Sequence, residues 1–246
     1  MLIAVALVNT LVLSSASLRA GLPPHQIGAA LNLGILATVF SHWIRGGLEQ
    51  GTVSLSVDLL CSSTTSLALS GAMLLVGIGS VVVPRLTPQR VDAQRKMLWG
   101  CCAVLAFLSL SVALVAGWRS FQTGITTDLH IASGILFTYS VVGMGVGAMV
   151  VNRLLLRVSA GLFWLALVHT MLFNLPLRET LFAWIQDDWS AWLGAQLVHG
   201  ILCSLAACLA WTLNRRSVHK DQRPAWRAVA AQELSWASLL STGLAV

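Results

Sequence analysis

Charged residues are scarce in this chain of 246 amino acids, where they make up 10% of the sequence. Hydrophobic residues make up 57%, and the mean hydropathy is +0.80. Because a soluble domain carries about 25% charged residues, this composition excludes an ordinary soluble domain. Runs of about 20 apolar residues are typical of transmembrane helices. We therefore expect an all-α fold, a polytopic integral membrane helix bundle.

The sequence also lacks the motifs of soluble enzymes, since it contains no GxSxG, P-loop or HExxH. Its five cysteines lie in apolar runs, their number is odd, and no CxxC occurs, which favours small buried side chains over disulfides or a zinc site. Acidic residues are nearly all in the predicted loops, which disfavours a small transporter with a proton relay. We expect no nucleic-acid partner, because a net charge of +6 in such a chain is better explained by membrane topology.

Hydropathy predicts seven transmembrane helices in a bundle formed by residues 1–212. The short connection NRLLLR predicts an antiparallel hairpin between the fifth and sixth spans. Residues 213–246 form a basic tail, whose last part is expected to be an interfacial helix anchored by Trp226 and Trp236. The predicted spans are residues 2–18, 27–46, 59–83, 97–117, 129–151, 155–175 and 191–212.

The basic residues predict an orientation for this bundle. With the N-terminus outside, twelve of the fifteen Lys and Arg residues fall on the inner side and three on the outer side. Cytoplasmic loops are enriched in Lys and Arg, so we expect an outside N-terminus and a cytoplasmic C-terminus. The expected location is the inner membrane of a bacterium. The three outer residues are Arg45, Arg119 and Arg178.

Four histidines fall within predicted spans and in the same half of the bilayer. They are His42, His130, His169 and His199. At a rise of ~1.5 Å per residue they lie in a layer roughly 10 Å deep. Histidine ligates metals and heme iron, and ionisable residues inside a membrane are usually functional. These four are therefore candidate ligands for one or two heme b groups; the alternative is hydrogen bonding between helices.

The helix that begins near His130 has a face of small residues that includes Gly134 and Gly145. Small residues allow either a flat macrocycle or a partner helix to approach the backbone. Arg45 and Arg119 lie on the same predicted side and are candidate partners for heme propionates; the alternative is that they are ordinary loop residues.

Residues 95–153 contain an apolar helix, a loop, His130 just inside the next helix, Gly143 and Gly147 further along, and a basic residue at the end. This segment resembles the first two helices of the catalytic subunits of heme–copper oxidases and nitric oxide reductases. The resemblance implies that His130 ligates a low-spin heme. This chain departs from that family in having about seven helices instead of at least twelve. It also lacks paired histidines for a copper site.

Two functions follow from these features. The first is a b-type cytochrome-like, electron-transfer subunit of a respiratory-type oxidoreductase complex, with a quinol or a c-type cytochrome as redox partner. The second is a non-catalytic membrane subunit that supports other subunits of a complex and binds lipid or pigment. Membrane lipids and other subunits are expected partners in both cases.

Overall fold

The computed structural model of this chain describes residues 2–20, 23–45, 59–86, 91–124, 126–215 and 225–244. Within these ranges every regular element is helical, and they contain no strand. The all-α expectation is therefore confirmed for the described residues.

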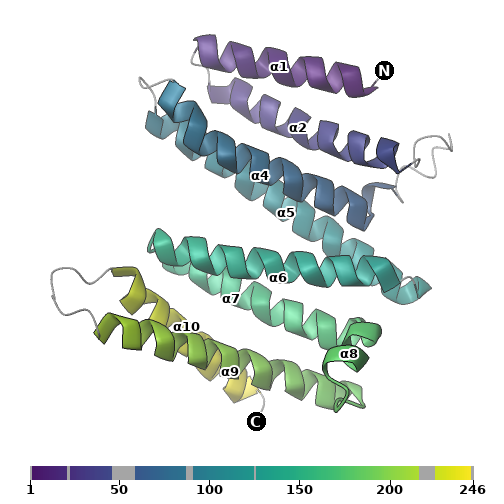
Figure 1. The fold of residues 1–246 in the computed structure, drawn as a ribbon, viewed down its shortest axis with the longest axis vertical. Helices are drawn as coiled ribbons and strands as arrows, with labels where there is room; N and C mark the ends of the chain where they lie inside the picture. The colour runs from purple at the N-terminus through teal and green to yellow at the C-terminus, as the bar shows by residue number, and fades with distance from the viewer. Residues whose placement is uncertain are drawn as a thin grey trace. The chain divides into compact units, whose positions relative to one another are not determined.

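The chain divides into two compact units, Met1–Ala116 and Gly117–Val246, whose boundary lies within helix α5 (Figure 1). The first unit contains α1 (Leu2–Ala20), α2 (Pro23–Ile44), α4 (Ser63–Leu86) and most of α5 (Val91–Thr123). The second contains the end of α5, then α6 (Thr126–Met149), α7 (Arg153–Val168), the π-helical turn η2 (His169–Phe173), α8 (Leu175–Leu181), α9 (Asp188–Arg215) and α10 (Ala225–Leu244).

Six of the described helices are long and apolar enough to cross a membrane, as expected of an integral membrane protein. Among the described residues, the apolar stretch of α1 is Ile3–Ala16, and α1 is not one of the six. Hydropathy therefore supports six of the seven predicted spans. The six are His25–Ile44, Ser63–Val82, Gln94–Thr123, Thr127–Met149, Arg153–Phe173 and Asp188–Asn214.

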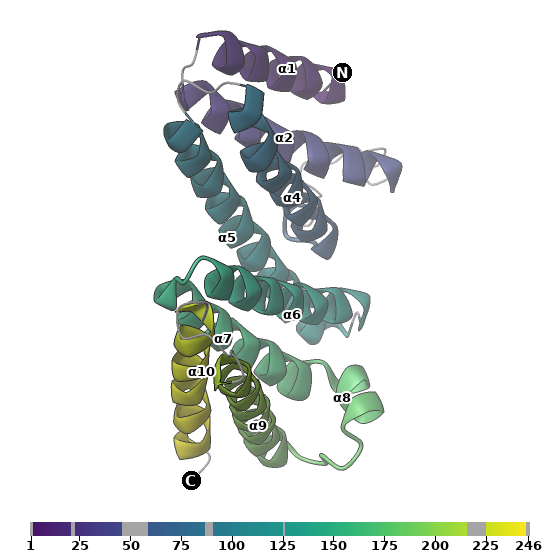
Figure 2. The ribbon, with the colours of Figure 1, turned by 60° about the vertical axis from the view of Figure 1, so that its left-hand side comes forward.

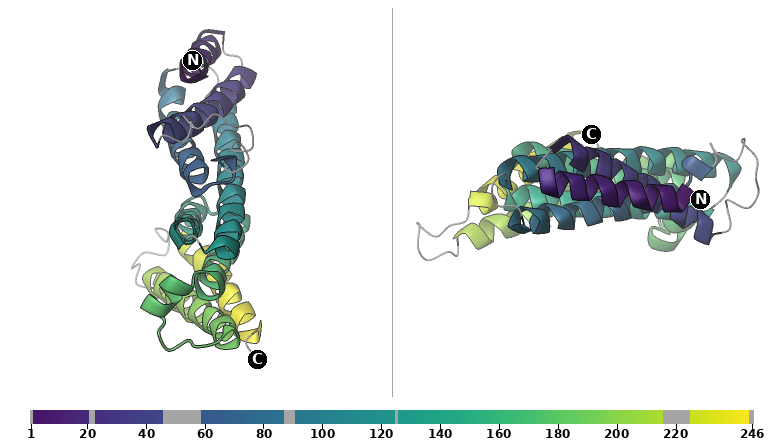
Figure 3. Two further views of the ribbon diagram at one scale, coloured as in Figure 1. Left: turned by 90° about the vertical axis from the view of Figure 1, so that its right-hand side faces the viewer. Right: turned by 90° about the horizontal axis from the view of Figure 1, so that it is seen from above.

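Small side chains pack the first unit. Its core brings together Ala30, Ala72, Val76, Leu98, Cys101, Cys102 and Leu105 from α2, α4 and α5. Hydroxyl groups join α4 to α5, because Ser66 Oγ donates to the Ser109 carbonyl at 2.7 Å and Ser70 Oγ lies 2.8 Å from Ser109 Oγ. Helix α1 packs along α2 (Figure 3).

The predicted hairpin between the fifth and sixth spans is present as α6 and α7, which pack against each other in the second unit. The Asn152 N–H donates to the Gly147 carbonyl at 2.8 Å, which ends α6, and the Asn152 side chain accepts from the Leu155 N–H at 3.1 Å, which starts α7. Between them Val151 has a φ of 55°, a conformation that a β-branched residue rarely adopts. The reversal is therefore held by caps at both helix ends.

Helix α10 lies along α9, as Figure 2 shows. Near one end of the pair, Ser238 Oγ donates to the Gly200 carbonyl at 2.8 Å; near the other, Arg227 donates to the Leu213 carbonyl at 2.7 Å. The helix predicted in the tail is thus present, and it packs on the bundle. Its hydropathy does not place it among the six apolar helices. Its location at a membrane interface stays a prediction.

Candidate functional site

The four candidate histidines are divided between the two compact units. His42 belongs to the first unit, and the other three belong to the second. Among the described residues, no group of three or more His, Cys, Asp or Glu side chains is arranged to hold a metal ion.

His42 and Arg45, both predicted ligand-binding residues, are together at the end of α2. His42 Nε2 lies 2.8 Å from Thr65 Oγ1, and Arg45 donates to Thr64 Oγ1 at 2.7 Å. Thr65 Oγ1 donates its own proton to the Leu59 carbonyl at 2.7 Å, so it accepts from His42. Both side chains therefore attach α2 to the start of α4.

His169 is the first residue of the π-helical turn after α7, and it is 6% exposed. Asn174 Nδ2 donates to Ser133 Oγ at 3.1 Å, and Ser133 Oγ lies 3.0 Å from His169 Nδ1. A neutral ring that accepts from Ser133 at Nδ1 carries its proton on Nε2. Within the described residues His169 Nε2 is buried without a hydrogen-bond partner.

His169 Nε2 has room because residue 117, which faces it, is a glycine. A Cβ atom at residue 117 would lie 2.8 Å from His169 Nε2, closer than real Cβ atoms approach. The imidazole therefore lies directly against the α5 backbone, where only glycine fits. The turn itself, in which the Asn174 N–H donates to the His169 carbonyl at 3.1 Å, is a local widening that is often found at functional sites.

His199, 3% exposed, connects three helices. Nε2 lies 3.0 Å from the Ala160 carbonyl of α7, and Nδ1 is hydrogen-bonded to Ser241 of α10. A carbonyl only accepts, so Nε2 donates and the neutral ring accepts from Ser241. Phe163 packs against the ring, with centroids 5.7 Å apart. Both ring nitrogens of His199 are thus engaged in joining α9 to its neighbours.

His130 and the predicted glycine face are open. His130 is exposed on α6, and a Cβ at Gly134 or Gly145 would meet no atom within 4 Å in the described structure. The half-buried Arg119 lies at the end of α5, and it too is engaged in an interaction. Neither glycine lies against another helix in the described ranges.

These positions test how well the histidines fit a heme. A metal bound at His169 Nε2 has no approach in this arrangement because Gly117 lies against that atom. His199 already uses both nitrogens, and His130 lies on an exposed face. As they stand, the donors are not arranged for an axial pair. Heme b binding stays a prediction.

A groove between α7, α9 and α10 has a volume of about 490 Å³. Its lining is mostly apolar and includes Gly161, Trp164, Trp236 and Leu240, with His199 also contributing. Pockets of roughly 300–1,000 Å³ are of a size to hold small ligands. The groove is a candidate binding site that the sequence did not predict.

A buried carboxylate lies in the same groove. Glu233, on α10, has a side chain that is 2% exposed, and it accepts from Arg157 Nε at 2.6 Å and from a terminal nitrogen of Arg157 at 3.3 Å. Arg153 Nε lies 3.9 Å from the same carboxylate. The sequence signal was a single acid within the apolar part of the tail helix, AWRAVAAQELSWASLLSTGL.

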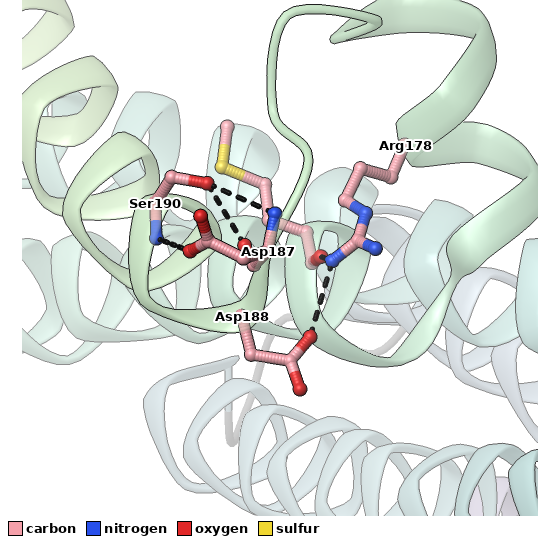
Figure 4. A network of polar contacts seen from close by, with 5 residues as sticks. Arg178, Asp187, Asp188 and Ser190 are labelled. Atoms are coloured by element: carbon pink, nitrogen blue, oxygen red, sulfur yellow. Dashed lines mark hydrogen bonds and ion pairs between the residues drawn. The ribbon is translucent and has the colours of Figure 1, made fainter.

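The connection before α9 contains a second charged cluster, shown in Figure 4. The buried Arg178 donates to Asp188 at 3.3 Å and to the Met171 carbonyl at 3.2 Å. Asp187 accepts from the Ser190 N–H at 2.6 Å. The backbone hydrogen bond from Ser190 lowers the pKa of the Asp187 carboxyl below its usual value. This cluster fixes the start of α9.

No protein-family model matches this chain, and neither a curated protein nor a solved structure resembles it significantly.

Proposed function

We propose that this protein is a non-catalytic, integral membrane subunit that supports the other subunits of a larger complex. One observation carries the proposal: every buried histidine of the described residues is hydrogen-bonded to another helix or to the turn beside it. His42 bonds to Thr65, His169 to Ser133, and His199 to Ala160 and Ser241. The histidines act as connectors in the packing of the bundle.

Interhelical hydrogen bonds of this kind are a general means of joining helices inside a membrane, where apolar packing alone does not distinguish a helix from lipid. The orientation that goes with the proposal has the N-terminus outside and the C-terminus in the cytoplasm of a bacterial cell. The excess of basic residues on the inner side supports it.

Purification from native membranes in a mild detergent tests the proposal. A supporting subunit is expected to migrate in native gels well above its own mass of 26.3 kDa. Defined partner proteins are also expected to accompany it. A chain that is recovered alone, with no partner under several mild detergents, contradicts the proposal.

The second candidate is a b-type cytochrome-like electron-transfer subunit with a quinol or c-type cytochrome partner. It is favoured by His169 Nε2, a buried ring nitrogen without a partner in the described residues. A heme there requires the ring to turn away from Gly117. A bound heme supplies one-electron redox chemistry, and the residues around His169 would orient its ring through Ser133 and Asn174.

A reduced-minus-oxidised spectrum of the purified complex, with heme quantified as the pyridine complex, separates the two candidates. A b-type signal that is lost in His169→Ala and kept in His130→Ala supports the cytochrome. A chain isolated with its partners but without a heme signal assigned to it supports the non-catalytic subunit.

A further inference from the structure

Arg157 and Glu233 line one end of the groove between α7, α9 and α10, and Arg153 lies beside them. Two guanidinium groups, those of Arg153 and Arg157, share one carboxylate, that of Glu233, which leaves a formal charge of +1. The arginine side chains are 56% and 64% exposed, whereas Glu233 is 2% exposed. The negative charge is therefore buried in the helix contact, and the positive charges face outward.

The guanidinium groups retain donors for another anion. The contacts of Arg157 with Glu233 use Nε and one terminal nitrogen. A guanidinium has five N–H donors in a planar fork, a geometry that matches phosphate. Glu233 fixes the position of Arg157 without consuming all of these donors.

The rest of the groove is mostly apolar. Trp164 and Gly161 of α7 form one wall, and Trp236, Ala237 and Leu240 of α10 form the other. At the far end His199 and Ser241 are bonded to each other. A ligand that fits this groove has a negative group at one end and an apolar chain that follows the two helices.

We propose that the groove binds an anionic glycerophospholipid. Its phosphate lies at Arg153 and Arg157, and one acyl chain lies between Trp164 and Trp236. Charge complementarity selects a lipid with net negative charge. The apolar extension of the groove favours a lipid over free phosphate, which has no chain to fill it. The inference goes beyond the proposed function, since the site lies within one unit of a single chain.

Native mass spectrometry of the full-length chain in detergent tests this inference. The probes are dioleoylphosphatidylglycerol, which is anionic, and dioleoylphosphatidylcholine, which is zwitterionic. Phosphatidylglycerol is expected to bind more tightly by about fivefold, the factor that one basic residue contributes near an anionic membrane surface. Excess inorganic phosphate is expected not to displace it.

Gly161 offers a variant that fills the groove without disturbing the helix. A Cβ at Gly161 meets no atom within 4 Å, so Gly161→Leu adds a side chain in open space. It is expected to weaken phosphatidylglycerol binding by about tenfold, which corresponds to about 1.4 kcal/mol. The matched control is Gly71→Leu on α4, where a Cβ also meets nothing within 4 Å and which does not line the groove.

Arg153→Gln tests the charge separately. Arg153 is the more distant of the two arginines, so the closer contact between Arg157 and Glu233 is retained. The variant is expected to lose most of the preference for phosphatidylglycerol while its binding of phosphatidylcholine is unchanged. Thermal melting of each variant in detergent checks that the fold is intact.

Three results would overturn the inference: equal binding of the two lipids, displacement of phosphatidylglycerol by inorganic phosphate, or wild-type binding by Gly161→Leu with a normal melting temperature. None of these measurements depends on partner proteins. A chain that shows the lipid preference but has no partner in native membranes contradicts only the proposed function.

Discussion

The contact between α4 and α5 in the first unit and the contact among α7, α9 and α10 in the second unit differ in their polar chemistry. In the first unit the contact between α4 and α5 is made by neutral hydroxyls, with Ser66, Ser70 and Ser109 bonded to one another and to backbone carbonyls. In the second unit, α7, α9 and α10 are joined by an imidazole, His199, and by an ion pair between Arg157 and Glu233.

The two contacts distribute their polar groups in different ways within an apolar bundle. A serine can return its proton to its own helix, as Ser70 does to the Ser66 carbonyl at 3.0 Å, so the loss of one partner leaves an alternative. An imidazole or a buried carboxylate has no such local alternative, and an unsatisfied buried group is costly. We therefore expect the α4–α5 contact to tolerate single substitutions better than the contact among α7, α9 and α10.

The largest effect is expected for His199→Ala, which removes bonds to two helices and leaves a void. Large-to-small changes in a packed core cost about 2–5 kcal/mol, and we expect about 3 kcal/mol. The measurement is the free energy of unfolding in mixed detergent micelles. The matched control, His130→Ala, changes an exposed histidine and is expected to cost at most about 0.5 kcal/mol. Similar losses in the two variants would contradict the role of His199.

Gly117→Ala is expected to have the next largest effect. The added Cβ meets His169 Nε2 at 2.8 Å, and the ring is held by Ser133 on its other side. Over-packing of this kind costs about 1–3 kcal/mol. At Gly161, by contrast, a Cβ meets open space, so Gly161→Ala is expected to be neutral or to stabilise the helix by up to about 1 kcal/mol. Equal melting temperatures for Gly117→Ala and Gly161→Ala would contradict this expectation.

A smaller effect is expected for Ser109→Ala in the first unit. Interhelical hydrogen bonds in membrane proteins contribute about 0.6 kcal/mol on average, and Ser66 and Ser70 can then turn to other acceptors. Double-mutant cycles with Ser66→Ala measure the coupling directly. A coupling as large as the loss for His199→Ala would show that the α4–α5 contact and the contact among α7, α9 and α10 do not differ in this respect.

The smallest effect is expected at Asp187, which lies outside the apolar helices. Hydrogen bonds from Ser190 lower its pKa in the folded protein below the ordinary 3.8. The carboxylate therefore contributes stability above pH 3.8 that is lost as the pH falls through the lower folded value. In acid titrations Asp187→Asn is expected to be slightly less stable than the wild type near neutral pH. The stabilities of the wild type and the variant should converge below the pKa of Asp187 in the folded protein. A constant difference in stability at every pH would rule out a contribution from the Asp187 carboxylate.

Hydropathy was sufficient to predict the six long apolar helices but not their contacts. Apolar runs of about 20 residues fix where a helix lies, and the short NRLLLR connection fixes the α6–α7 hairpin. Depth alone placed His169 and His199 in the same layer of candidate heme ligands. The structure directs them toward different neighbours, because His169 bonds to α6 and His199 to α7 and α10. Which face of a helix meets which neighbour is a long-range property that a local pattern does not contain.

The groove was missed for a related reason. Helix α10 has a lower hydropathy than the six apolar helices, because it includes Arg227, Gln232 and Glu233. Sequence reasoning therefore assigned it to the tail. The polarity of Glu233 is matched by Arg157, which lies 76 positions earlier in the chain. A polar helix whose charges are satisfied by a distant partner cannot be distinguished by composition from a helix that faces water.

The pairing of α9 and α10 has a consequence for the number of times the chain crosses the bilayer. Twenty residues of helix extend about 30 Å, the thickness of the hydrocarbon layer. Because α10 is bonded to α9 near both of its ends and runs back along it, α10 shares the depth of α9. If α9 crosses the bilayer, α10 returns across it. If all six apolar helices cross as well, this return makes seven crossings, an odd number that places the start of α2 and the end of α10 on opposite sides of the membrane.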